Sequence, residues 1–348
     1  MKEWIKVGMV LAMILGWPVT GISQDFSTSD LEGSWYLYST EVDSSVPAVY
    51  WLTGNFEVDA AGNMAGVYTA PDGSSVALTS GQMTVARDGT IKGSFSAETG
   101  LTGTVVDGKL DRSKTFGNAV MIGSDGTMDL ATMIKGGGTF ASGDIQGEWY
   151  SYATIIDPVT GGVFWMYGTL DVDSSGNVTG SYTGPDGTTA AVTGGSFPLD
   201  ESGVIDGSMT LSMGERSLTP SFQGKLDPGK TFVAWAGVAE DESMAVGYLH
   251  KAGGTFTPGE GKGFWYAYGL SIDPTVPAVY WAYGRSVFDA SDDLKGVLNA
   301  PTGEQLRATS DSVLDENGVF TGTLAFSNGD TGMTASAKLD QNRTSLTG

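Results

Sequence analysis

The chain of 348 residues has no cysteine and only one histidine, His250. These absences exclude disulfide bonds, a cysteine nucleophile, thiolate zinc sites and metal centres built from several histidines. Basic residues are also scarce, because 18 Lys and Arg stand against 40 Asp and Glu, which gives a formal net charge of −22. Such a chain repels phosphate groups, so we expect neither a nucleic-acid partner nor binding to an anionic membrane surface.

Long apolar runs are missing as well. The apolar stretch 7–19 has 13 residues, whereas a membrane span requires roughly 18 to 20. Two lysines precede this stretch, and small residues occupy the −3 and −1 positions of a cleavage point before Gln24. We therefore expect residues 1–23 to be a secretory signal peptide, with an N-terminal membrane anchor as the alternative. The mature chain would be exported, to the periplasm, the cell surface or the exterior, without a membrane span.

What the chain does contain is one unit that occurs three times. Each copy opens with Gly-x-Trp-Tyr, and its tryptophans are Trp35, Trp149 and Trp265, spaced by 114 and 116 residues. Each copy later carries a pair of adjacent aromatic residues and a Lys-Leu-Asp motif. The aromatic pairs are Tyr50 with Trp51, Phe164 with Trp165, and Tyr280 with Trp281. A period near 115 is far longer than the roughly 20 to 50 residues of solenoid repeats, so each copy is large enough to be a domain.

The three expected domains are residues 31–140, 145–256 and 261–348, and short Gly-rich linkers join them. Such linkers predict separate domains with limited freedom rather than one shared core. The third copy is shorter than the second by about two strands. This shortness has two interpretations: a truncated product, or an open sheet edge that accepts a strand from another molecule and so supports self-association.

Within a unit, apolar residues alternate with polar or small ones, which is typical of half-buried strands. In the first unit the expected strands are 35–42, 49–58, 64–69, 76–85, 90–96 and 102–110. Asp-Gly and Gly-Asn pairs, at Asp88-Gly89 and Asp107-Gly108 among others, predict tight turns between them. The fold class is therefore all-β: three tandem antiparallel meanders of about eight strands, each closed into a small up-and-down barrel, the third incomplete. A weaker half-repeat leaves a six-bladed propeller as an alternative.

The opening Gly-x-Trp-Tyr resembles the first-strand signature of lipocalins and of the shorter avidin-like barrels. Both families are eight-stranded up-and-down barrels that hold a small ligand. The resemblance covers about four residues per unit together with the meander pattern. It implies that Trp35, Trp149 and Trp265 close the floor of each barrel, which is a packing role.

The aromatic pairs are the best binding candidates, because an indole offers a flat apolar face with a polar edge that suits a glycan or a small apolar ligand. Strand alternation sends the two members of a pair to opposite faces. The alternative is structural: one member fills the core and the other packs against the next unit.

Neither a metal site nor catalysis is predicted. The repeated turn aspartates Asp59, Asp173 and Asp289 lack the spacing of a calcium loop, and turn chemistry explains them. No pair of carboxylates stands out as a glycosidase pair, and His250 occurs in one unit only, so we expect no catalytic residues, no cofactor and no enzyme activity. The favoured function is a non-enzymatic exported repeat protein, a structural or adhesive element at the cell surface or outside the cell. The alternative is a lipocalin-like module that binds a small ligand or glycan.

Overall fold

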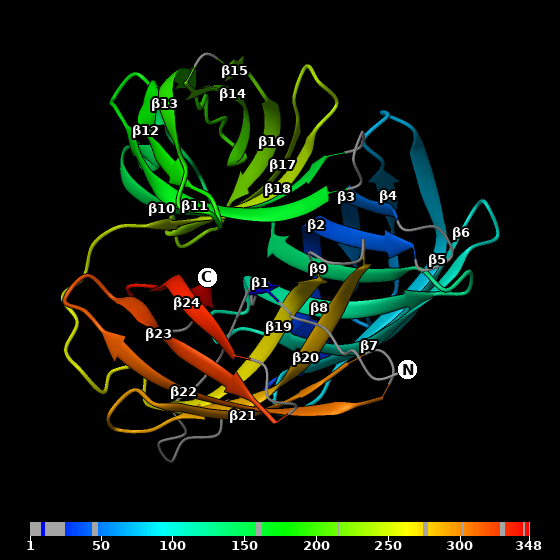
Figure 1. The fold of residues 1–348 in the computed structure, drawn as a ribbon. Helices are drawn as coiled ribbons and strands as arrows, with labels where there is room; N and C mark the ends of the chain where they lie inside the picture. The colour runs from blue at the N-terminus through cyan, green and yellow to red at the C-terminus, as the bar shows by residue number, and fades with distance from the viewer. Residues whose placement is uncertain are drawn as a thin grey trace. The chain divides into compact units, whose positions relative to one another are not determined.

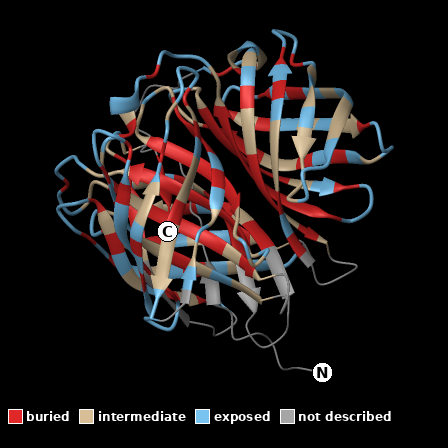
Figure 2. Ribbon diagram, turned by 90° about the horizontal axis from the view of Figure 1, so that it is seen from above, coloured by how far each residue is buried: buried red, intermediate tan, exposed pale blue. Residues whose placement is uncertain are grey.

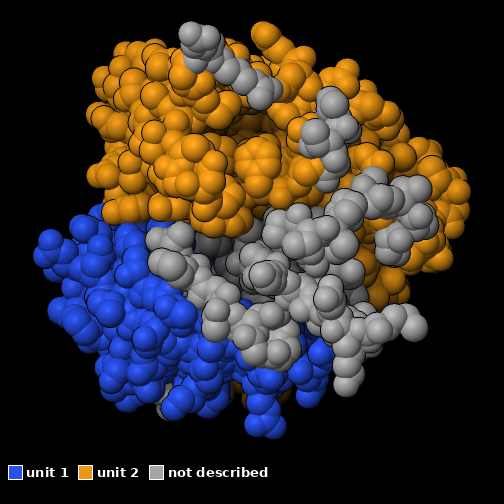
Figure 3. All heavy atoms as spheres, in the orientation of Figure 1, with its two compact units in different colours: residues 1–24, 253–348 blue, residues 25–252 orange. Residues whose placement is uncertain are grey.

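The computed structural model describes residues 8–10, 25–43, 48–157, 162–214, 216–273, 278–300, 303–327, 331–343 and 345–347. Their regular structure is antiparallel β-strand apart from two short 3₁₀ helices, which confirms the all-β prediction (Figure 1). Two compact units contain these strands, one formed by residues 25–252 and the other by residues 1–24 with 253–348 (Figure 3). Among the described residues, no helix has the length and apolar character needed to cross a bilayer.

The first repeat is a closed barrel in which each strand pairs with the next and the last pairs with the first. A 3₁₀ helix, η1 (Thr28–Leu31), precedes it. The strands are β2 (Gly33–Asp43), β3 (Ala48–Val58), β4 (Met64–Thr69), β5 (Ser75–Val85), β6 (Thr90–Ala97), β7 (Thr102–Leu110), β8 (Phe116–Gly123) and β9 (Met128–Lys135).

The second repeat forms a second closed barrel, since β10 pairs with β18 and β13 pairs with β14. The 3₁₀ helix η2 (Ser142–Ile145) precedes it, and the short β15 extends from β14. Its strands are β10 (Gly147–Asp157), β11 (Gly162–Val172), β12 (Val178–Thr183), β13 (Thr189–Ser196), β14 (Val204–Met213), β15 (Arg216–Leu218), β16 (Ser221–Leu226), β17 (Phe232–Val238) and β18 (Met244–Lys251).

The third repeat is an open sheet, as expected for an incomplete copy. Its strands are β19 (Gly263–Asp273), β20 (Ala278–Phe288), β21 (Leu294–Asn299), β22 (Gln305–Leu314), β23 (Val319–Phe326), β24 (Thr331–Leu339) and β25 (Leu346–Thr347). The edge of β19 pairs with β1 (Gly8–Val10). This short strand lies within the expected signal peptide and takes the place beside β19 that β9 and β18 take in the closed barrels.

Each repeat encloses its own apolar interior, and buried residues recur along the strands with exposed ones between them (Figure 2). Separate clusters of buried side chains fill the second barrel and the third sheet. The Asp-Gly turns behave as expected where glycine must adopt positive φ, as at Gly89 with φ of 84°. Asp107-Gly108 is an exception: it lies inside β7, where the register with β8 shifts at a bulge, and it makes no turn.

The Lys-Leu-Asp motif shapes the loop that follows it. The carboxylate of Asp227 accepts backbone N–H bonds from Gly229, Thr231 and Phe232 at 2.7 to 2.9 Å. Lys230, in the same loop, adopts the left-handed conformation with φ of 60°. These bonds explain why the motif recurs: the aspartate satisfies donors of a turn that cannot pair in the sheet.

The first two barrels are packed against each other within one compact unit, which differs from the loosely linked domains that the Gly-rich linkers predict. Equivalent residues of the two repeats meet at this interface. The rings of Phe116 and Phe232 lie 4.6 Å apart edge to face, and the hydroxyls of Thr132 and Tyr248 are 3.1 Å apart. Both pairs are separated by 116 residues in sequence. The interface is therefore of the pseudo-twofold kind, in which one surface of a repeat contacts the same surface of its copy.

Candidate functional site

The opening tryptophan of each repeat is buried at the start of its first strand. Trp35, Trp149 and Trp265 are at most 1% exposed. Each indole N–H donates to the carbonyl oxygen of the residue four positions earlier, at 2.7 Å in all three cases. Because each polar edge is satisfied inside the fold, these residues offer a ligand no free group.

The members of the aromatic pairs are placed here one repeat at a time. Trp51 is 9% exposed and donates from Nε1 to the carbonyl of Gly237 at 3.1 Å, so it packs on the second barrel rather than lining the first. Its neighbour Tyr50 is 39% exposed. Within the first pair, Trp51 thus packs against the next unit, whereas Tyr50 does not fill the core.

The other two pairs are placed in related ways. Phe164 is 39% exposed, and the ring of Trp165 lies 5.8 Å from that of Tyr167. Trp281 is 2% exposed with its ring 5.5 Å from that of Tyr283, whereas the side chain of Tyr280 lies outside the described residues.

The turn aspartates and His250, which the sequence analysis considered for metal binding or catalysis, have partners within the fold. Asp59 accepts the backbone N–H groups of Ala61 and Asn63, both at 2.9 Å, and Asp173 repeats this arrangement. In the described part of the chain no three acidic or histidine side chains gather in a way that could hold a metal ion. His250 is fully buried, with its ring 4.9 Å from that of Phe232.

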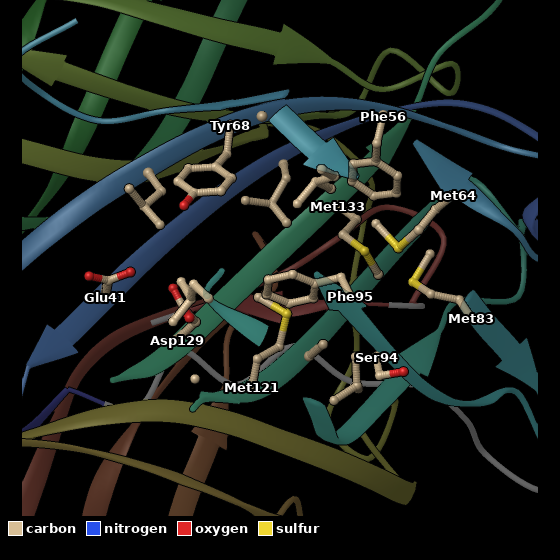
Figure 4. Close-up of a pocket in the computed structure, with 18 of the residues that line it drawn as sticks. Glu41, Phe56, Met64, Tyr68, Met83, Ser94, Phe95, Met121, Asp129 and Met133 are labelled. Carbon is tan, nitrogen blue, oxygen red and sulfur yellow. The ribbon is translucent and has the colours of Figure 1, made fainter. Parts of the chain in front are cut away.

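The first barrel contains a cavity of about 80 Å³. Its walls are largely aliphatic and aromatic, and four methionines line it together with two phenylalanines (Figure 4). These six residues are Met64, Met83, Met121, Met133, Phe56 and Phe95. Unbranched methionine side chains adapt to irregular shapes, so the cavity has walls that adjust to an occupant.

In the second barrel a buried indole occupies the corresponding position. Trp235 faces Gly224 across its hairpin, and Ala119 faces Gly108 at the equivalent position of the first barrel. The Trp235 ring lies 5.5 Å from that of Phe222, which in turn lies 4.8 Å from that of Phe197. Alanine in place of this indole removes the largest side chain from the barrel centre, which accounts for the cavity.

Two acidic side chains lie at one end of the cavity. Glu41 on β2 and Asp129 on β9 are direct cross-strand partners, and both line the cavity with Tyr68 (Figure 4). Asp129 is 6% exposed and accepts a hydrogen bond from Ser39 Oγ at 2.9 Å. The equivalent pair in the second barrel is Ile155 with Ala245, so the acid pair does not belong to the repeated pattern.

Burial and mutual repulsion change the protonation of this pair. Burial raises the pKa of Asp129 to about 8, and the nearby Glu41 and Asp125 carboxylates add to the increase, while the Ser39 bond opposes it. Burial also raises the pKa of Glu41, with further contributions from Asp125 and Asp43. The cavity therefore has an apolar body and one end that can carry negative charge.

Sequence reasoning missed the cavity because it concentrated on repeated residues. Glu41 and Asp129 are polar residues at inward positions of strands, and they replace apolar residues of the second repeat. That departure from the repeat was the available signal.

No protein-family model matches the sequence, and a comparison with curated proteins gives no match either. Among solved structures, the chain is similar to a protein of unknown function from the DUF3598 family of Nostoc punctiforme, with 9% identity and a TM-score of 0.22 over 66% of this chain and 100% of that one. It also has a similarity to the Myxococcus xanthus hemagglutinin in complex with a mannopentaose, with 8% identity and a TM-score of 0.14 over 62% of this chain and 99% of that one. At scores this low neither similarity carries an argument about fold or function, and neither supports the lipocalin or avidin-like resemblance.

Proposed function

We propose that this chain is an exported, non-enzymatic binding protein whose first barrel holds a small, mostly apolar molecule. The observation that carries the proposal is the difference between two copies of one unit: Ala119 stands where Trp235 fills the second barrel. Duplication of a purely structural unit gives no reason to hollow one copy, because an unfilled cavity lowers stability.

The volume of the cavity limits the size of the ligand. At about 80 Å³ it is well below the roughly 300 to 1,000 Å³ of sites for drug-sized molecules. A ligand of a few heavy atoms fits, and rotation of the lining methionines accommodates a slightly larger one. A sugar residue carries hydroxyl groups on most of its carbons, and the largely apolar walls would leave them without hydrogen-bond partners, so we do not place a glycan inside the barrel.

Two carboxyl groups close together raise the question of glycoside hydrolysis. Glycosidases need two carboxylates that flank a sugar bond together with space for the substrate. Here the pair lies at the end of a small apolar cavity, which supports binding rather than glycoside hydrolysis.

The second barrel supports a structural role within the same protein. Its interior is packed with Phe197, Phe222 and Trp235, and its outer face covers Trp51 of the first barrel. We propose that it stabilises the binding barrel, and the structural or adhesive role at the cell surface is retained as a second candidate for this part of the chain.

Nuclear magnetic resonance of ¹³C-methyl methionine tests the proposal on the full chain with 1-pentanol as the probe. We expect shifts confined to the methyl groups of the four cavity methionines. Ala119→Trp fills the cavity and abolishes these shifts, whereas Ala65→Trp adds the same side chain at an exposed position of β4 and leaves them unchanged.

Two results would contradict the proposal: shifts spread over methionines outside the cavity, or cavity shifts that persist in Ala119→Trp. If Ala119→Trp does not fold, the smaller Ala119→Leu replaces it and should weaken the shifts in proportion to the volume it fills.

A further inference from the structure

Among the residues that the structure describes, the acid pair in the first barrel has no cationic partner. None of the ion pairs within the described part of the chain involves Glu41 or Asp129. Asp129 accepts a hydrogen bond from the hydroxyl of Ser39, which is neutral. Placing two carboxyl groups side by side in a desolvated position is unfavourable unless something compensates for them.

The chain elsewhere avoids this cost. In the second barrel the same two positions hold Ile155 and Ala245, which face each other between β10 and β18. The fold therefore does not require acids here, and apolar residues serve the barrel at equivalent positions. Because the two carboxyls border the cavity that we propose as a ligand site, their compensating group is the ligand itself.

We propose that the ligand of the first barrel is a small primary amine: a short apolar body bearing an ammonium group that lies between Glu41 and Asp129. This inference rests on the proposed function and adds the chemical class of the ligand to it. The apolar body contacts Phe95, Met121 and the other methionines, and the ammonium group takes the end where the acids lie (Figure 4). An ammonium group offers three N–H donors, enough for both carboxylates and the Tyr68 hydroxyl.

The proposal predicts how the affinity for the ligand depends on pH. In the empty barrel the raised pKa of Asp129, about 8, keeps this group protonated at neutral pH. The groups that face it are Glu41 on β2, Tyr68 on β4 and Asp125 in the turn before β9. An entering cation favours the ionised form, so binding releases a proton. The affinity for an ammonium ion should then rise with pH, by up to about tenfold per unit below pH 8.

The experiment compares three probes with the same five-carbon chain: n-pentylammonium, 1-pentanol and pentanoate. Each is titrated into the full chain between pH 6 and pH 9, with the methionine methyl groups as the readout. We expect n-pentylammonium to bind about tenfold or more tightly than 1-pentanol at pH 8, as a charge-assisted hydrogen bond implies. Its affinity should increase with pH, whereas that of 1-pentanol should not.

Variants assign the effect to the acid pair. Asp129→Asn and Glu41→Gln keep the shape of the side chains and should remove most of the preference for the ammonium probe, while binding of 1-pentanol persists. Asp171→Asn removes one negative charge from an exposed position of the second barrel and should leave the preference unchanged. This control separates the local pair from the overall charge of the chain.

The outcomes distinguish this inference from the function on which it rests. Equal affinity for n-pentylammonium and 1-pentanol would overturn the inference and leave a neutral-ligand site. Tighter binding of pentanoate, decreasing as pH rises, would overturn it in favour of a carboxylic acid ligand. Failure of all three probes to shift the cavity methionines would reject the proposed function and the inference together.

Discussion

Replacing Asp129 by asparagine should change how the stability of the protein depends on pH. In the folded state its pKa is raised from 3.8 to about 8, chiefly by burial and then by the charge of Glu41. Between these two values the folded chain holds a proton that the unfolded chain releases. Stability therefore falls as pH rises through this window, and it stops falling on this account above pH 8.

The size of the effect follows from linkage. One proton bound in excess by the folded state corresponds to about 1.4 kcal/mol per pH unit, hence to about 4 kcal/mol between pH 5 and pH 8. Asp129→Asn still accepts the Ser39 bond but cannot ionise. The free energy of unfolding of this variant relative to the unsubstituted chain should therefore increase by about that amount over the same interval.

Urea denaturation at closely spaced pH values, followed by tryptophan fluorescence, measures this difference. The comparison with Asp171→Asn removes the general repulsion among acidic residues, because both variants lose one negative charge. We expect the curve of Asp171→Asn to run parallel to that of the unsubstituted chain. Parallel curves for Asp129→Asn as well would show that Asp129 ionises normally in the barrel and would refute the reasoning.

Three further predictions concern the packing of aromatic side chains and the pairing of an edge strand. Trp235→Ala should lower the free energy of unfolding by about 3 to 5 kcal/mol, as for other buried aromatic residues, and Trp165→Ala, at a half-buried position, should cost less than half as much in the same urea titration. A double-mutant cycle of Phe116→Ala and Phe232→Ala should give a coupling of about 0.5 to 1.5 kcal/mol, whereas additive effects would be inconsistent with the observed ring contact. A chain that begins at Gln24 lacks β1, so the edge of β19 that faces away from β20 loses its partner strand. Size-exclusion chromatography with light scattering should then show multimers that increase with concentration, and a monomer at every concentration would contradict this expectation.

Strands were predictable from the sequence because their cause is local. Alternation of apolar and polar residues placed one strand at 64–69 and another at 102–110, the same bounds as β4 and β7. The turn at Gly89 was predictable because glycine supplies the positive φ it needs. Asp107-Gly108 carried the same signal but lies in a bulge, since the pairing of β7 with β8 depends on the closure of the whole barrel.

The candidate site was not predicted, and the reason is physical. Repeated residues such as Trp35 and Trp51 report what every copy needs in order to fold and pack. The cavity instead depends on Ala119, Glu41 and Asp129, which differ from their counterparts in the second repeat. Repetition therefore directs attention to the scaffold, whereas the proposed ligand site lies where the first copy departs from the second.

The two closed barrels show how such a departure is tolerated. By the relation between cavity volume and stability, an unfilled space of about 80 Å³ costs about 2 kcal/mol. The contacts between the barrels offset a loss of this size, since the Phe116 and Phe232 rings and the Trp51 hydrogen bond each contribute about 0.5 to 1.5 kcal/mol. These contacts use the outer surface of the first barrel, whereas the cavity lies inside it. The second barrel thus stabilises the first from outside, and the first barrel keeps its fold although it contains the cavity.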